Sequence, residues 1–110
     1  MKNHRDKGKS LEEYVADRLA DILKDPSIKP TKASGASTQL GDILCQQFLI
    51  ECKQRTTFSI TIKEEVWNKL CGELPLGSIR IPLYILENKN KKRWAVLDLE
   101  DFLRILKNKL

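Results

Sequence analysis

The first regular pattern along the chain is helical. Apolar residues recur every three or four positions from residue 11 to residue 22, which is the spacing of one face of a helix. Ser10 is followed three residues later by Glu13, the pattern of a capping box at a helix start, and Pro26 follows the last apolar position. We therefore predict a helix that begins after Ser10 and ends before Pro26.

Short apolar runs that are typical of strands come next. Residues 28–40 predict a short strand that leads into a loop of small residues. The apolar runs 42–45 and 48–53 are separated only by Gln46 and Gln47, which predicts a tight antiparallel hairpin. Because this dipeptide is not favoured in two-residue turns, a longer turn with the same centre is the alternative.

The second half of the chain repeats both patterns. Residues 61–74 predict a second helix that opens with a capping box between Thr61 and Glu64. Residues 78–87 and 93–99 flank a basic turn and predict a second strand pair.

The remaining patterns complete the predicted fold. Pro82 indicates a sheet edge or a bulge in the second strand pair. Residues 98–110 carry apolar residues at helical spacing, with lysines near the C-terminal end, where the helix dipole favours them. The predicted order is αβββαββα, a mixed α/β (α+β) sheet flanked by helices. Residues 1–110 are expected to form one domain with one core, preceded by a basic arm at residues 1–9.

Charge and composition narrow the class of partner. The chain carries a formal net charge of +5, which indicates a polyanionic partner, although solubility alone explains this charge equally well. No apolar run reaches transmembrane length, and the polar first residues lack the apolar core of a signal peptide. We therefore expect a cytoplasmic protein that does not associate with membranes.

The three cysteines do not predict a metal or nucleophilic site. Their number is odd, their spacing fits no zinc motif, and His4 is the only histidine. Cys45 and Cys52 fall on apolar strand positions and Cys71 falls on a helix. We expect reduced thiols that pack as small apolar side chains.

Charged residues inside the first predicted hairpin indicate a catalytic site. With the turn at residues 46–47, Asp42 lies opposite Glu51, and Lys53 falls on the same face of the sheet. Opposed carboxylates repel each other unless a cation lies between them. Mg²⁺ suits such a pair because water and phosphate oxygens complete its coordination, and Mn²⁺ is expected to substitute for it. Lys53 is then placed to orient or help deprotonate the attacking water, which predicts phosphodiester hydrolysis. A structural ion cluster of the same residues is the alternative.

A fourth acidic residue belongs to the first predicted helix. On a helical wheel, Glu12 falls within the apolar arc, whereas Glu13 falls outside it and is explained by the capping box. We predict that Glu12 reaches the metal or its water, the alternative being a side chain that bends into solvent. A second E-x-K triplet, Glu87 to Lys89, leads into a polar turn without an upstream acid on an apolar strand, and we expect solvated turn charges there.

The combination of Asp42 with Glu51, Cys52 and Lys53 resembles the catalytic signature of the PD-(D/E)xK nuclease superfamily. The order of elements matches as well. Over nearly the whole chain, the segments KGKSLEEYVADRL, ASGAS, GDIL, FLIECKQR, GSIRIPLYIL and RWAVLDL resemble the archaeal and viral Holliday junction resolvases. Gly41 stands where the superfamily has its nominal proline, and the hairpin is shorter than is usual in the resolvases. The resemblance implies a restriction-endonuclease-like fold, Mg²⁺-dependent cleavage of branched DNA, and a part in DNA recombination and DNA repair.

The resemblance also implies a role for individual residues. Glu12 occupies the position of the family's N-terminal glutamate, four residues after Gly8, and Lys53 occupies that of the catalytic lysine. The family's serine in the loop before the aspartate corresponds to Ser34 or to Ser37. The implied ligands of Mg²⁺ are Asp42, Glu51 and the main-chain carbonyl of Cys52.

Basic residues lie on both sides of the predicted site. They suit contacts with DNA phosphates that do not read sequence, although a solvated surface role is an equal alternative for any single lysine. No helix-turn-helix or zinc module is evident, which favours recognition of DNA shape. The predicted DNA-binding residues are Lys7, Lys9, Lys32 and Arg55, with Ser34 and Ser37 from the resemblance.

Together these patterns predict a structure-selective DNA endonuclease that acts on branched or four-way junction DNA. We expect a two-fold homodimer, because one small domain with one site cuts one strand at a time. Trp67, Trp94 and the C-terminal helix are candidates for the dimer surface, with ordinary core packing as the alternative. A nicking or restriction-type nuclease that acts on duplex DNA is a second hypothesis. A non-catalytic nucleic-acid-binding protein is a third, and the opposed acids argue against it because binding alone needs none.

Overall fold

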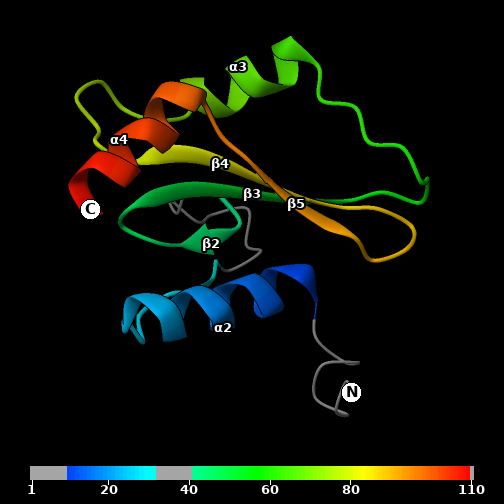
Figure 1. The fold of residues 1–110 in the computed structure, drawn as a ribbon, viewed down its shortest axis with the longest axis horizontal. Helices are drawn as coiled ribbons and strands as arrows, with labels where there is room; N and C mark the ends of the chain where they lie inside the picture. Colours follow the sequence, from blue (N-terminus) through cyan, green and yellow to red (C-terminus); the bar gives the residue numbers. More distant parts are fainter. Residues whose placement is uncertain (1–9, 32–40, 110) are drawn as a thin grey trace.

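The computed structural model describes residues 10–31 and 41–109. Within these ranges the chain forms three helices and one five-stranded sheet, and their order confirms the predicted αβββαββα arrangement (Figure 1). The elements are α2 (Leu11–Leu23), β1 (Lys29–Pro30), β2 (Ile43–Leu44), β3 (Phe48–Gln54), α3 (Glu64–Gly72), β4 (Ile81–Glu87), β5 (Arg93–Val96) and α4 (Leu99–Lys109).

The sheet is mixed, as the sequence predicts. Its strands lie in the order β1-β2-β3-β4-β5, with β3 parallel to β4 and all other neighbours antiparallel. Parallel neighbours need a crossover connection, and the segment that carries α3 provides it. The β2–β3 hairpin and the β4–β5 hairpin therefore lie side by side.

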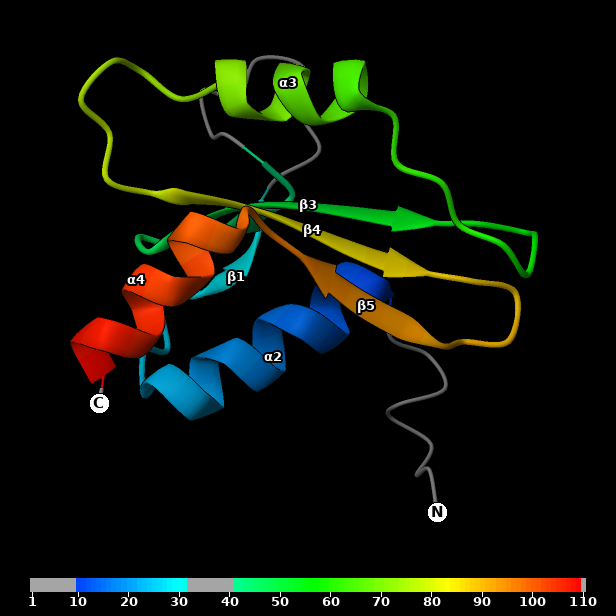
Figure 2. The same ribbon diagram turned by 45° about the horizontal axis from the view of Figure 1, so that its top comes forward.

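Helices α2 and α3 cover opposite faces of this sheet (Figures 1 and 2). On one face, Leu11 of α2 belongs to a buried cluster with Ile50 of β3. On the other face, Leu70 of α3 packs in a cluster with Leu49 of β3. Neighbouring residues of β3 thus face different helices, which is the alternation that a strand imposes.

The two helix starts differ in how well the sequence predicts them. The predicted capping box of α2 is present: Ser10 Oγ accepts from the N–H of Glu13 at 3.1 Å, and Glu13 Oε1 accepts from the N–H of Ser10 at 3.2 Å. The predicted box between Thr61 and Glu64 is wrong. Helix α3 begins at Glu64, so Lys63 is its N-cap and Thr61 lies too far upstream for its side chain to cap the first turn.

Pro82 lies in an interior strand but at a locally unpaired position. The N–H of Ile81 donates to the carbonyl of Gln47, so the next residue, Pro82, directs its nitrogen away from β3. Strand β5 pairs with β4 only from Tyr84 onward. The missing N–H of Pro82 therefore costs no hydrogen bond of the sheet. At this position β4 has no partner strand among the described residues on the side opposite β3, so the predicted sheet edge is local to Pro82.

The cysteines are free thiols, as expected. Cys45 and Cys52 are buried in the cluster under α2, and Cys71 is partly buried in α3. They pack as small apolar side chains.

Helix α4 lies at the end of the sheet away from the β4–β5 turn (Figures 1 and 2). It is amphipathic, and most of its large apolar side chains are exposed. The exposed large apolar residues of α4 are Leu99, Phe102, Leu103 and Leu106. None of the described helices is long and apolar enough to cross a membrane.

Candidate active site

The β2–β3 hairpin has the predicted register. Ile43 lies opposite Ile50, as a turn centred on residues 46–47 requires, and both turn residues are exposed. Strand β2 begins at Ile43, so Asp42 lies one residue outside the ladder. The predicted site therefore lies where β3 continues past the start of β2.

Asp42 is attached to β3 by two hydrogen bonds. Its main-chain N–H donates to the carbonyl of Ile50 at 2.7 Å, and its Oδ2 atom accepts from the main-chain N–H of Cys52 at 2.7 Å. The sequence predicts a regular cross-strand pair of Asp42 with Glu51. In the structure the Asp42 carboxylate instead replaces a strand carbonyl as the acceptor for β3, which leaves Oδ1 as its candidate ligand atom.

Gly41 explains why the chain can approach β3 at this point. Its φ angle is +75°, which proline cannot adopt, and a Cβ atom there would lie only 2.7 Å from the carbonyl oxygen of Ile50. The backbone conformation just before Asp42 thus requires a glycine.

Glu51 and Lys53 form an ion pair on the α3 face of the sheet. They alternate with Ile50 and Cys52, which face α2, and Lys53 Nζ lies 3.3 Å from Glu51 Oε2. Burial raises the pKa of Glu51, and the negative charge of Asp42 raises it further, against the lowering effect of Lys53. Asp42 and Glu51 are therefore close enough to repel each other, as the sequence predicts.

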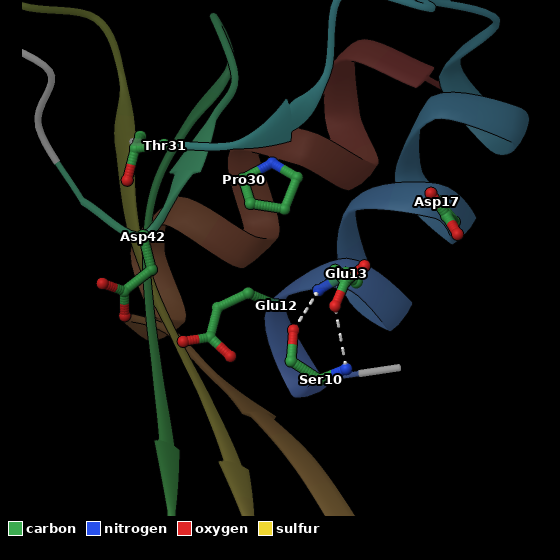
Figure 3. Close-up of a pocket in the computed structure, with 7 residues that line it drawn as sticks. All are labelled: Ser10, Glu12, Glu13, Asp17, Pro30, Thr31 and Asp42. Carbon is green, nitrogen blue, oxygen red and sulfur yellow. Dashed lines mark hydrogen bonds between the residues drawn. The ribbon is translucent and has the colours of Figure 1, made fainter. Parts of the chain in front are cut away.

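Glu12 reaches the same region from α2. Glu12 and Asp42 line one open pocket of about 580 Å³, and Figure 3 shows the Glu12 side chain extended toward the sheet edge that carries Asp42. Glu13 instead turns back to Ser10 in the capping box (Figure 3). The structure thus separates the two adjacent glutamates in the way that the helical wheel predicts.

The Cys52 thiol is buried on the α2 face of the sheet. Burial raises the pKa of the Cys52 thiol strongly, and the negative charges of Glu12, Asp42 and Glu51 raise it further, in that order. The thiol is consequently held in its protonated form, so it serves neither as a nucleophile nor as a soft metal ligand. Of the predicted acidic residues, Asp42 lies close to Glu51, and Glu12 lines one pocket with Asp42.

The oxygen atoms at this site fit a hard cation that keeps much of its water. Across residues 10–31 and 41–109, no three Asp, Glu, His or Cys side chains gather closely enough to hold a metal ion by themselves. Mg²⁺ needs no such cage, since it commonly uses one or two carboxylates with water and phosphate oxygens. In a strand the carbonyl of a residue points to the same side as its N–H, so the Cys52 carbonyl faces the edge where Asp42 lies. Asp42, Glu51 and this carbonyl suit Mg²⁺.

Several predicted DNA-binding residues lie outside the described residues. Arg55 is described: it follows β3, two residues beyond Lys53, and its side chain is exposed. The predicted residues outside the described ranges are Lys7, Lys9, Lys32, Ser34 and Ser37.

The expectation of solvated charges at Glu87 is wrong. Glu87 is only 2% exposed, and its carboxylate accepts from Gln54 Nε2 and from Arg93 Nε, each at 2.8 Å. Burial alone would raise the pKa of Glu87, but these hydrogen bonds and the nearby cations outweigh it, so the pKa is lowered. Glu87 lies opposite Gln54 on β3 and opposite Arg93 on β5, so it joins three strands at one end of the sheet. The sequence contained one indication of this buried network: Arg93, at the other end of the β4–β5 turn, is the cross-strand partner of Glu87.

Comparisons of the chain with protein-family models, with curated proteins and with solved structures found no match in any of the three.

Proposed function

We propose that the protein is a Mg²⁺-dependent endodeoxyribonuclease that hydrolyses phosphodiester bonds in branched DNA, in the manner of a Holliday junction resolvase. The observation that carries this proposal is that Asp42 lies close enough to Glu51 to raise its pKa, with Lys53 paired to Glu51 and Glu12 lining the same pocket as Asp42. The negative charge of Asp42 raises the pKa of Glu51, a repulsion that a bound cation would relieve, and the pocket beside Asp42 is open to solvent on the Glu12 side.

Each side chain has a distinct role in this proposal. Asp42 and Glu51 hold Mg²⁺, which supplies charge stabilisation for the phosphate when bound. Lys53 keeps its ammonium beside Glu51, where it orients the attacking water and offsets charge on the phosphate. Glu12 lies across the pocket from Asp42, where it accepts a hydrogen bond from water at the site.

A structural ion cluster explains the arrangement less well. The Lys53 side chain is 41% exposed, and an ion pair with that much solvent access contributes under about 1 kcal/mol. A structural pair would also need only one acid, whereas the site brings Asp42 next to Glu51 at an electrostatic cost. Glu87 shows how the same chain satisfies an acid that has a structural role, with two hydrogen bonds and no second carboxylate.

The test incubates purified protein and Mg²⁺ with a four-way DNA junction and, separately, with linear duplexes that have the sequences of its arms. We expect cleavage of the junction and little cleavage of the duplexes. Equal cutting of both would instead identify a duplex nuclease. Binding without cleavage of any DNA, with Mg²⁺ or Mn²⁺, would identify a binding protein.

Paired variants test the residues. Asp42→Asn and Lys53→Ala should abolish cleavage and leave the fold intact, while Lys69→Ala, on the exposed side of α3, should cut normally. Glu12→Gln should lower cleavage, whereas the adjacent Glu13→Gln should not, since glutamine also completes a capping box. Full activity in Asp42→Asn or in Lys53→Ala would refute the mechanism.

The proposal includes a two-fold homodimer that pairs through α4. Trp67 packs against Tyr84 in the core, whereas the apolar face of α4 is exposed. The helix begins with acidic residues 100–101 and carries Lys107 near its end, so an antiparallel pair places opposite charges together. Leu103→Glu should convert a dimer to a monomer in light scattering. A monomeric wild-type protein would refute this part.

A further inference from the structure

A groove with two exposed aromatic side chains lies on the α3 face near the edge strand β5. Phe58 is 60% exposed and Trp94 is 39% exposed. Aromatic residues make up only 6% of the chain, so two exposed rings at one groove call for an explanation. The groove has a volume of about 360 Å³, and Leu86 of β4 and Val96 of β5 line it beside them. Nothing in the candidate active site uses these two rings.

Cations lie against both rings. The Nζ atom of Lys89 is 5.1 Å from the centre of the Phe58 ring, and the Nζ atom of Lys92 is 5.6 Å from that of Trp94. Neither ammonium forms an ion pair within the part of the chain that the structure describes. Exposed rings beside unpaired cations are what proteins use to bind single-stranded nucleic acid, in which the bases stack on the rings and the phosphates contact the cations.

Hydrogen bonds hold the turn that carries these cations. Asn88 is 8% exposed, and its Oδ1 atom accepts from the N–H groups of Asn90 and Lys92 at 2.9 Å and 3.0 Å. Its Nδ2 atom donates to the carbonyl of Phe58 at 3.0 Å, so the same side chain connects the turn to the segment that carries the ring. The backbone of the turn is therefore held beside the Phe58 segment before a ligand arrives, which lowers the entropy cost of binding.

The groove is connected to the candidate active site through the sheet register. Lys53 lies opposite Leu86, and Leu86 lies opposite Trp94, so all three point to the α3 face. Because neighbouring strands are separated by about 4.8 Å, the positions of Lys53 and Trp94 are about 10 Å apart. Arg55 and Lys89 line a neighbouring pocket of about 410 Å³ at the same end of the sheet, so cations continue from Lys53 to the groove.

We infer that this groove binds an unpaired nucleotide of a DNA strand, with its base stacked on Trp94 and Phe58 and its phosphates on Lys89 and Lys92. The class of ligand follows from charge complementarity, because the ammonium groups of Lys89 and Lys92 beside the rings favour a polyanion. The inference rests on the proposed function in naming DNA, since a branch point supplies unstacked nucleotides next to the cleaved phosphate.

The test measures binding without metal. A short fluorescein-labelled oligodeoxythymidine is titrated with the 110-residue chain in EDTA, and fluorescence anisotropy gives Kd. Trp94→Leu should raise Kd about 5- to 150-fold, the range expected for one stacked base. Trp94→Phe keeps a ring and should bind within about twofold of the wild type. Lys89→Ala should reduce the slope of log K against log salt concentration by about 0.7, whereas Lys69→Ala should leave it unchanged.

The outcomes separate this inference from the nuclease proposal. Wild-type oligonucleotide binding by Trp94→Leu would overturn the inference, even if the protein cuts junctions. Loss of a dimer in Trp94→Leu would also overturn it, because the groove would then be a subunit contact. Tighter binding of oligouridine than of oligodeoxythymidine would overturn the choice of DNA. Trp94-dependent oligonucleotide binding by a protein that cuts no DNA would support the groove and refute the nuclease.

Discussion

Gly41 is the position at which backbone conformation controls the candidate site, so Gly41→Ala is the most informative single substitution. Its φ angle of +75° costs about 1–2 kcal/mol for a residue with a Cβ atom. The added Cβ would also lie 2.7 Å from the Ile50 carbonyl oxygen and 3.0 Å from Leu49 Cδ1. Overpacking of this kind adds about 1–3 kcal/mol, so the free energy of unfolding should fall by about 2–5 kcal/mol in total.

Gly77→Ala provides the matched control. Gly77 has a similar φ of +84°, but a Cβ atom there meets nothing within 4 Å. It should therefore lose only the backbone contribution, about 1–2 kcal/mol. The difference between the two variants isolates the close approach of residue 41 to β3.

Cleavage should separate the two variants further. The Ile50 carbonyl that the new Cβ would strike also accepts the N–H of Asp42, so relief of the clash moves the Asp42 carboxylate. A displacement of about 1 Å at a catalytic group costs about 100-fold in rate. Urea denaturation gives the stabilities, and junction cleavage under conditions where both variants are folded gives the rates. Equal losses of stability in the two variants, together with wild-type cleavage by Gly41→Ala, would refute the reasoning.

Three further predictions concern other acids and the first helix. The pKa of Glu51 is raised above its ordinary value of 4.5, so the folded state binds a proton at Glu51 more tightly than the unfolded state does. The free energy of unfolding therefore falls as the pH rises from the unfolded-state pKa through the folded-state pKa of this carboxyl. Without metal, Glu51→Gln should therefore be more stable than the wild type to urea at neutral pH, and the difference should vanish in acid; a less stable variant at neutral pH would contradict the assigned electrostatics. Glu87→Ala should lower the free energy of unfolding by about 1.5–3 kcal/mol, because Arg93 and the Gln54 amide lose their acceptor, and unchanged urea stability would show that the network contributes nothing. Ser10→Ala should cost about 0.5–2 kcal/mol through loss of the bond to the Glu13 N–H, measured as a shift of the urea midpoint, and a neutral result would mean that water replaces the cap.

Local patterns predicted much of the fold and the site. The spacing of apolar residues in 11–22 and the capping box at Ser10 placed α2 correctly, since both signals act within a few residues. The hairpin register followed from the turn at residues 46–47, because two-fold alternation leaves only one pairing that buries Ile43 and Ile50 together. That register also brought Asp42, Glu51 and Lys53 to one region.

Other features depend on contacts between segments that are distant along the chain. Glu87 is part of a polar turn in the sequence, and only the pairing of β4 with both β3 and β5 buries it against Gln54 and Arg93. The bond from Cys52 to Asp42 arises because β2 is too short to supply a backbone acceptor there, which no periodicity reveals.

The sequence by itself determined the order of elements and the face of each residue within the strands, because these follow from periods of 3.6 and two residues. The tertiary structure alone decided which polar residues are buried and which apolar ones stay exposed, as Glu87 and Trp94 show. Burial depends on what packs on a residue from elsewhere in the chain, and that information is not local.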